Sequence, residues 1–249
     1  FEYFDHLKVN HTLFDFHVVK SWVGYHDPNI VHLPFPYPWV SESQQDQRKF
    51  FRDSLNQVLC EKGLDLQKDV CGIMMETFQG WGAVFYPKDY VKAAEQFCLE
   101  NDIVFTFDER QAGFARTGKA FGYHHYDVKP DLICCGKGMG NGYPLSGVIG
   151  KKEIMDLPEI GNMSSTHSAN PMACSIGLAV IEEIENQNLI EESSRKGKIL
   201  KDNLNDLKNK SNGRINYVLG EGLISAVLFK DPKTNKPDGF IASKIAEKC

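Results

Sequence analysis

The chain has 249 residues, of which 42% are hydrophobic and 24% charged, and its formal net charge is -5. This length buries the core of one large domain, or of one domain and part of a second. The acidic balance excludes the basic surface typical of nucleic-acid binding, and no apolar run approaches the ~20 residues that span a bilayer, which indicates a protein that handles small molecules.

Residues 1–45 form the least regular part of the sequence and are rich in aromatic residues, His and Pro. Because Pro fixes φ and carries no backbone N–H, the Pro-rich stretch at 33–38 predicts an extended segment on the surface.

From residue 46 onward, helical and strand-like patterns alternate. Apolar residues at helical spacing predict helices over 47–61, 87–100, 171–186 and 189–207. Short apolar or β-branched runs predict strands over 71–75, 103–107, 132–135 and 146–149. Strands separated by helices indicate an α/β fold with a mainly parallel sheet flanked by helices.

The C-terminal part has a different pattern, which predicts a strand, a turn and a second strand over 214–229. We therefore expect three regions: irregular segments at 1–45, a large α/β domain at 46–212, and the start of a small, truncated C-terminal α+β domain at 213–249.

Three ionisable residues follow predicted strands. Glu76 and Asp108 end the first and second strands, and Lys137 comes just after the third. Ligands of parallel α/β sheets lie beyond the carboxyl ends of the strands. A carboxylate and a lysine around one crevice suit a pyridine aldehyde cofactor, since the carboxylate keeps the ring nitrogen protonated and the lysine forms a Schiff base.

Each of these residues also has a plainer interpretation. An acidic residue after a strand is often a helix cap or part of a solvated loop, and a lysine among glycines can be an exposed loop. A nucleotide-binding loop is excluded, because a G-x-x-x-x-G-K-[ST] motif ending around Lys137 requires glycine where Asp131 stands and Ser or Thr where Gly138 stands.

Four ordered motifs carry a resemblance to a known family. The segments 75–83, 107–118, 129–145 and 165–171 resemble, in that order, the glutamate, aspartate, lysine and phosphate-binding motifs of class III aminotransferases of the ornithine and 4-aminobutyrate type. Asp108 and Lys137 also have the separation that the family uses. The resemblance implies the fold type I architecture of transferases that depend on pyridoxal 5'-phosphate.

The family's roles carry over to four positions of the large domain. Lys137 would bind the cofactor as a Schiff base and, once released by the substrate amine, move the Cα proton. Asp108 would pair with the pyridinium nitrogen, and Gln111 would hydrogen-bond the 3-oxygen side of the cofactor. Glu76 would lie near the substrate carboxylate.

Ser165 and Thr166 carry the phosphate-binding role, which in this family usually serves the neighbouring subunit. The resemblance therefore implies a homodimer with shared active sites. The alternative is that these hydroxyls merely cap the helix that begins near Pro171.

Metal binding is not expected, and neither is a disulfide framework. The seven cysteines are odd in number and most lie in apolar runs, which favours buried free thiols in a reducing compartment, hence a cytoplasmic protein. No cysteine pair has zinc-finger spacing, and no H-E-x-x-H motif occurs.

The sequence departs from the family at both ends. The family's Gly-Ser-x-Ala-type phosphate loop and its ring-stacking aromatic residue are not found upstream of Asp108, and a stretch is missing near residues 20–25. The chain stops at Cys249, before the arginine that usually binds the substrate carboxylate. We expect an incomplete chain of a larger enzyme; a truncated or degenerate protein is the alternative.

The predicted activity is transfer of an amino group from an amine or amino acid donor to a 2-oxo acid. Two alternatives remain open: a non-transaminating enzyme with the same cofactor, such as an aminomutase, racemase or decarboxylase, and a catalytically inactive scaffold.

Overall fold

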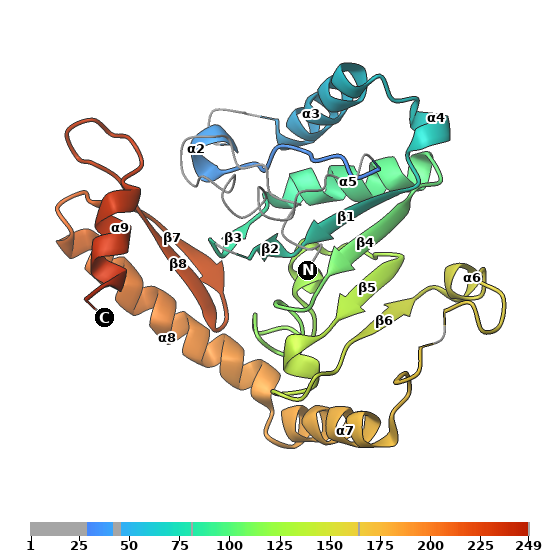
Figure 1. Cartoon of the computed structure of the whole chain (residues 1–249). Coiled ribbons are helices and arrows are strands. Elements are labelled where there is room, and N and C mark those ends of the chain that lie inside the picture. The colour runs from blue at the N-terminus through green and yellow to red at the C-terminus, as the bar shows by residue number, and fades with distance from the viewer. Residues whose placement is uncertain (1–28, 42–45, 81, 164, 249) are drawn as a thin grey trace.

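The computed structural model describes residues 29–41, 46–80, 82–163 and 165–248, so most of the irregular N-terminal region and the stretch expected to be missing near 20–25 lie outside it. Its centre is a four-stranded sheet of order β1-β4-β5-β6 (Figure 1). Strands β1, β4 and β5 are parallel to one another, and β6 at one edge of the sheet is antiparallel to β5. Their bounds are β1 Gly72–Glu76, β4 Val104–Asp108, β5 Leu132–Cys135 and β6 Gly147–Gly150. The mainly parallel sheet predicted from the sequence is confirmed.

Helices α3 (Gln47–Lys62) and α5 (Lys88–Glu100) contact each other, and α5 also contacts β1 and β4 (Figure 1). The α3 helix begins where the Asp46 carboxylate accepts backbone N–H groups of the first turn, and it ends at Gly63, whose φ of 65° is left-handed. The core between helices and sheet is rich in aromatic side chains, and Phe107 at its centre is fully buried. Burial of such a side chain contributes about 1.5–3 kcal/mol.

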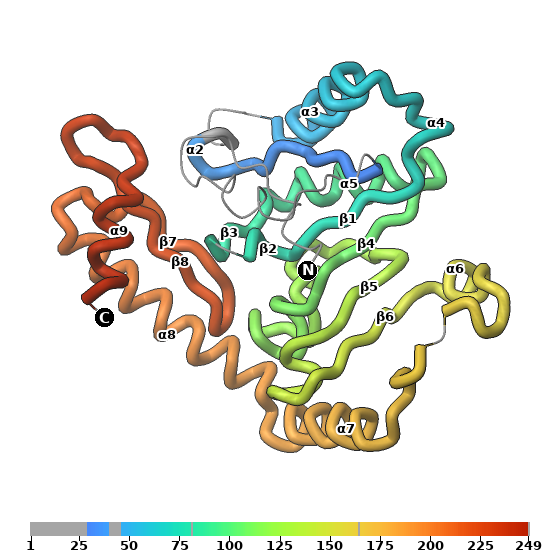
Figure 2. Tube along the Cα trace, viewed as in Figure 1, coloured from blue at the N-terminus to red at the C-terminus, as the bar shows by residue number. Residues whose placement is uncertain are grey.

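A long connection leads from the sheet to two further helices (Figure 2). It contains the short helix α6 (Lys152–Met155) and ends at α7 (Pro171–Asn186), which is followed by α8 (Leu189–Lys210). The side chain of Asn170 caps α7 by accepting from the backbone N–H groups of its first turn.

The C-terminal region is a hairpin and a helix. Strands β7 (Ile215–Glu221) and β8 (Ile224–Phe229) pair antiparallel and α9 (Gly239–Ala246) follows, so the predicted strand, turn and strand are confirmed. The turn rests on the loop after β4, where the N–H of Leu223 donates to the carbonyl of Arg116 at 2.9 Å. The domain boundary at 213 stays a prediction.

The prediction of a surface segment at 33–38 is wrong. The stretch is extended and leads into the short helix α2 (Pro38–Ser41), but Phe35 and Tyr37 are only 7% and 8% exposed. Both pack against Val84 of the small β2–β3 hairpin (Phe78–Gln79 and Val84–Phe85). Proline limits backbone hydrogen bonding, but it does not keep the neighbouring aromatic rings out of the core.

The six cysteines in the described part of the chain are free thiols, but only Cys98 and Cys135 are buried, so the prediction of mostly buried thiols is wrong. No helix in the described ranges is long and apolar enough to cross a membrane. Within the same ranges no group of His, Cys, Asp and Glu residues could hold a metal ion.

Candidate active site

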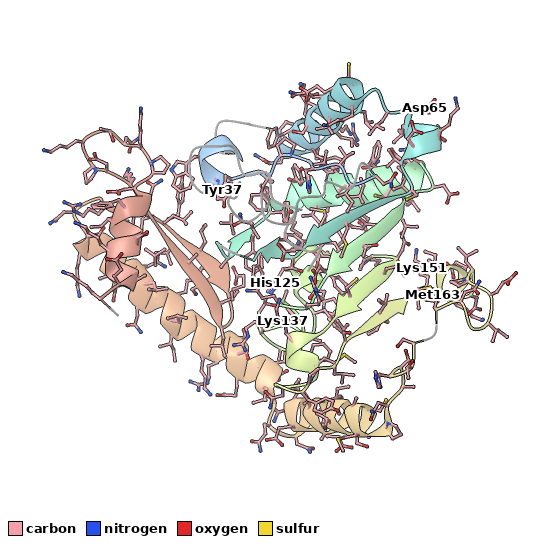
Figure 3. All side chains as sticks on the ribbon, in the orientation of Figure 1. Tyr37, Asp65, His125, Lys137, Lys151 and Met163 are labelled. Carbon is pink, nitrogen blue, oxygen red and sulfur yellow. The ribbon has the colours of Figure 1, made fainter. Side chains whose placement is uncertain are left out.

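The parallel register brings the sequence-predicted residues to one edge of the sheet. Glu76 pairs with Asp108 across β1 and β4, and Asp108 pairs with Cys134 across β4 and β5. Lys137 begins the 3-10 turn η3 (Lys137–Met139), two residues after β5 ends. All three ionisable side chains therefore arise at the carboxyl ends of neighbouring strands, where α/β sheets bind ligands. Figure 3 labels Lys137 at this edge.

Lys137 is held in a restricted backbone conformation. Its φ is 44°, in the left-handed region that is uncommon for a residue with a Cβ. The preceding Gly136 is buried, and a Cβ there would lie 3.2 Å from Cγ of Arg110. The backbone at 136–137 is thus fixed tightly against the Asp108 loop, while the Lys137 side chain itself is exposed.

Asp108 is buried and holds a cation. Its side chain is 6% exposed and forms an ion pair with the guanidinium of Arg110. Nε of Arg110 donates to both carboxylate oxygens at 3.1 Å, and Nη2 donates to Oδ2 at 2.8 Å. The backbone N–H of Arg110 adds a bond to Oδ1 at 3.0 Å. Charge-assisted hydrogen bonds in this two-pronged geometry are stronger than hydrogen bonds between neutral groups. Sequence reasoning assigned Arg110 no role.

Glu76 and Gln111 meet at Gly80. The N–H of Gly80 donates to Oε2 of Glu76 at 3.2 Å, and the amide of Gln111 donates to the carbonyl of Gly80 at 3.4 Å. Burial raises the pKa of Glu76 and the Asp108 charge raises it further, whereas the Gly80 bond and the charges of Lys137 and Arg110 oppose the rise. The charges of Asp108, Lys137 and Arg110 therefore all act on the pKa of Glu76, as expected for groups that lie close together.

Glu109, which sequence reasoning also missed, anchors the loop beside the site. It is fully buried and accepts hydrogen bonds from the hydroxyl of Thr77 and from the N–H groups of Gly122 and Tyr123, the last two at 2.6 and 2.9 Å. Burial raises its pKa to about 7 although the three donors oppose the rise. The sequence showed only a second acidic residue directly after Asp108; its burial, which requires several donors, became visible in the structure.

Ser165 and Thr166 are not grouped with the other predicted residues. Strand β6 runs back along the sheet, so the connection to α7 begins at the edge opposite Lys137, where Lys151 pairs with Asp131 at 2.6 Å. In Figure 3 the labelled Met163 and Lys137 are well separated. Ser165 and Thr166 are exposed, and Asn170 rather than either hydroxyl caps α7, so the interpretation of these residues as helix caps is wrong.

A model of the family described as "Aminotransferase class-III" matches residues 15–248. The chain belongs to this family. A probable 4-aminobutyrate aminotransferase of Bacillus subtilis is 35% identical over 231 residues, covering 91% of this chain and 52% of the relative. An isoleucine 2-epimerase of Lentilactobacillus buchneri is 33% identical over 228 residues, covering 88% and 49%.

Solved aminotransferase structures share the fold. A taurine:2-oxoglutarate aminotransferase of Bifidobacterium kashiwanohense, solved in complex with PLP and glutamate, superposes with a TM-score of 0.77 at 28% identity and covers 90% of this chain and 51% of that one. The fold type I architecture is therefore confirmed. The chain spans about half the length of the relatives that it matches.

The residues of this class III chain fit the ring of pyridoxal phosphate. Asp108 is a buried carboxylate at the carboxyl end of β4, and a buried carboxylate suits a cationic partner such as a protonated ring nitrogen. Lys137 offers an exposed primary amine at the same edge of the sheet.

Proposed function

We propose that the protein containing this chain is a pyridoxal-phosphate-dependent aminotransferase with its cofactor on Lys137. The observation that carries the proposal is the convergence of Glu76, Asp108 and Lys137 on one edge of the sheet. The bound cofactor would supply an electron sink that stabilises negative charge at Cα of the substrate.

Each side chain has a distinct task in this proposal. Lys137 would hold the cofactor through Nζ and, once displaced by the substrate amine, would be the base that moves the Cα proton. Asp108 keeps the ring nitrogen protonated by pairing with its N–H. Gln111 hydrogen-bonds the 3-oxygen side of the ring, and Glu76 lies toward the substrate carboxylate.

We also propose that two copies associate and that Ser165 and Thr166 serve the phosphate in the partner's site. In support, the connection before α7 and the α7 helix expose many large apolar side chains: Met155, Leu157, Ile160, Met163, Met172, Leu178 and Ile181. Large apolar side chains exposed in number along one stretch of a folded chain support the presence of an interaction site. The exposed hydroxyls of Ser165 and Thr166 lie in the same stretch.

A second candidate function is epimerisation at Cα, and the similarity to the Lentilactobacillus isoleucine 2-epimerase supports it. The same side chains serve both reactions, because the electron sink is shared and only the fate of the proton differs. Amino transfer is the first choice, since the Bacillus subtilis relative and the Bifidobacterium structure carry aminotransferase names.

The deciding experiment uses the full-length protein loaded with pyridoxal phosphate. It is incubated with 4-aminobutyrate, ornithine, N-acetylornithine, taurine or isoleucine, each with and without 2-oxoglutarate. Formation of glutamate supports the aminotransferase, whereas change of isoleucine stereochemistry without an acceptor identifies the epimerase. Borohydride reduction followed by peptide mass spectrometry should find the cofactor on Lys137. Absence of both activities together with absence of a labelled lysine would leave the inactive scaffold.

The cytoplasmic location stays a prediction. The free thiols of the six described cysteines support it, because a reducing compartment keeps thiols unpaired.

A further inference from the structure

One charged contact in the candidate site is not explained by the roles above. The Asp108 carboxylate, which the proposed function assigns to the ring nitrogen, has both oxygens engaged by the guanidinium of Arg110. The contact is local, because Arg110 lies only two residues after Asp108 and its backbone N–H also binds Oδ1. The pair is partly desolvated, with side-chain exposures of 6% for Asp108 and 29% for Arg110.

A pyridinium and a guanidinium compete for the same acceptor. The ring N–H needs a carboxylate oxygen with a free lone pair in the plane of the ring. Oδ2 receives two bonds from Arg110, and Oδ1 receives one side-chain and one backbone bond from the same residue. Two cations next to one carboxylate also repel each other, and a partly buried setting screens this repulsion weakly.

We propose that Arg110 is a built-in competitor for Asp108, which neutralises the buried carboxylate before the cofactor binds and must release at least one of its oxygens to the ring nitrogen. The inference rests on the proposed function, since it takes pyridoxal phosphate as the ligand of Asp108. Arg110 is therefore a residue that sets how readily the site takes up its cofactor.

Surrounding packing restricts where the arginine can go. Its Cβ, Cγ and Cδ line Gly136, where an added Cβ would lie 3.2 Å from Cγ. The aliphatic stem is thus held between the Asp108 loop and the residue before Lys137, and the guanidinium is the part that can move. A displaced guanidinium would move toward solvent, which its partial exposure allows.

Two opposite consequences follow for the Arg110→Met variant. Its cofactor-free form should be less stable than the wild type, because the buried Asp108 carboxylate loses its partner. Its affinity for pyridoxal phosphate should rise, since a ligand binds more weakly when its acceptor must first be released by a competing group. We expect an about tenfold lower Kd and a larger thermal shift on cofactor addition than in the wild type.

The experiment uses the full-length protein freed of cofactor. Pyridoxal phosphate is titrated into it, and binding is followed by visible absorbance and by tryptophan fluorescence in wild type, Arg110→Met and Arg110→Lys. The lysine variant keeps the charge without the two-pronged geometry, so its Kd should fall between the other two. Arg195→Met is the matched control, because Arg195 forms an equally two-pronged but exposed pair with Glu192 on α8.

A second pair of variants separates competition from packing. In an Asp108→Asn background the replacement of Arg110 by Met should change the Kd much less than in the wild-type background. Unchanged or weaker binding by Arg110→Met, or an equal gain in both backgrounds, would overturn the inference. If the wild-type protein takes up no pyridoxal phosphate at all, the proposed function and this inference both fail, whereas failure of the variants alone leaves the proposed function standing.

Discussion

The carboxyl edge of the sheet and the connection before α7 contain functional candidates in opposite settings. At the sheet edge Asp108 is buried and lies between paired strands on both sides. In the connection the described residues 155–163 and 165–170 are all exposed, including the fully exposed apolar Ile160. The chain orients the first set through its own sheet, whereas under the proposed dimer the second set would act in the site of the partner chain. Substitutions at the sheet edge should therefore impair the site of the chain that carries them. Substitutions in the connection should impair activity only in the assembled protein.

Replacement of Lys137 should give the largest loss. Lys137→Ala removes both the covalent attachment and the proton-transfer group, so we expect activity to fall by about 1,000-fold or more. Because Lys137 is exposed, the Tm of the cofactor-free protein should stay unchanged. Lys152→Ala, an equally exposed lysine on α6, is the control and should keep full activity. A Lys137→Ala enzyme with wild-type turnover would remove Lys137 from the proposal.

Replacement of Asp108 should cost less. Asp108→Asn keeps the shape but loses the charge that favours a protonated ring nitrogen, and we expect kcat to fall about 100- to 1,000-fold. Because Arg110 loses its partner at the same time, the variant should also unfold at a lower temperature. Spectra of the bound cofactor report directly on the ring nitrogen, and an unchanged spectrum would show that Asp108 does not touch it.

Mixed dimers test whether the exposed connection acts on another chain. One subunit carries Lys137→Ala and the other carries Thr166→Ala, each inactive or impaired alone. If Thr166 acts in the partner's site, one site of the heterodimer receives both defects and the other receives none. About half of the wild-type activity should then return in purified heterodimers, following the symmetry of a two-fold assembly. Thr166 acting within its own chain predicts no recovery.

The pH dependence of stability gives the smallest and most local test of the buried edge. The pKa of Glu109 is raised to about 7, so the folded chain holds this proton more tightly than the unfolded chain. The resulting stabilisation is complete below the unfolded pKa and is lost as pH rises through about 7, by up to about 3 kcal/mol. We expect the Tm to fall by several degrees between about pH 5 and about pH 8.

Glu109→Gln should flatten that part of the pH profile, since the side chain no longer titrates. Glu61→Gln, an exposed residue of α3, is the control and should leave the profile as in the wild type. A profile with the same slope in Glu109→Gln and wild type would assign the pH dependence to other groups.

Local physics made much of the fold predictable. The helices at 47–62 and 171–186 begin at Asp46 and Asn170, whose side chains cap them, and both lengths follow from apolar spacing. The strands at 72–76 and 104–108 are buried runs whose last residues are Glu76 and Asp108. Periodicity and strand ends are properties of neighbours along the chain, so they could be predicted in order, whereas the capping roles of Asp46 and Asn170 were found only in the structure.

Two features of the fold needed the folded chain. The Pro-rich stretch is buried because Phe35 and Tyr37 meet Val84, nearly fifty residues further on. The convergence of Glu76, Asp108 and Lys137 depends on parallel register, which no local pattern specifies.

The sequence by itself determined the element order, the approximate bounds of the main helices and the presence of an aspartate and a lysine at strand ends. Only the tertiary structure decided that the Asp108 carboxylate accepts hydrogen bonds from Arg110. It also decided that Glu109 accepts from three donors, which belong to Thr77 and the 122–123 turn. The physical reason is that a buried carboxylate takes whichever donors the packing brings within about 3 Å, and that choice depends on the fold rather than on spacing along the chain.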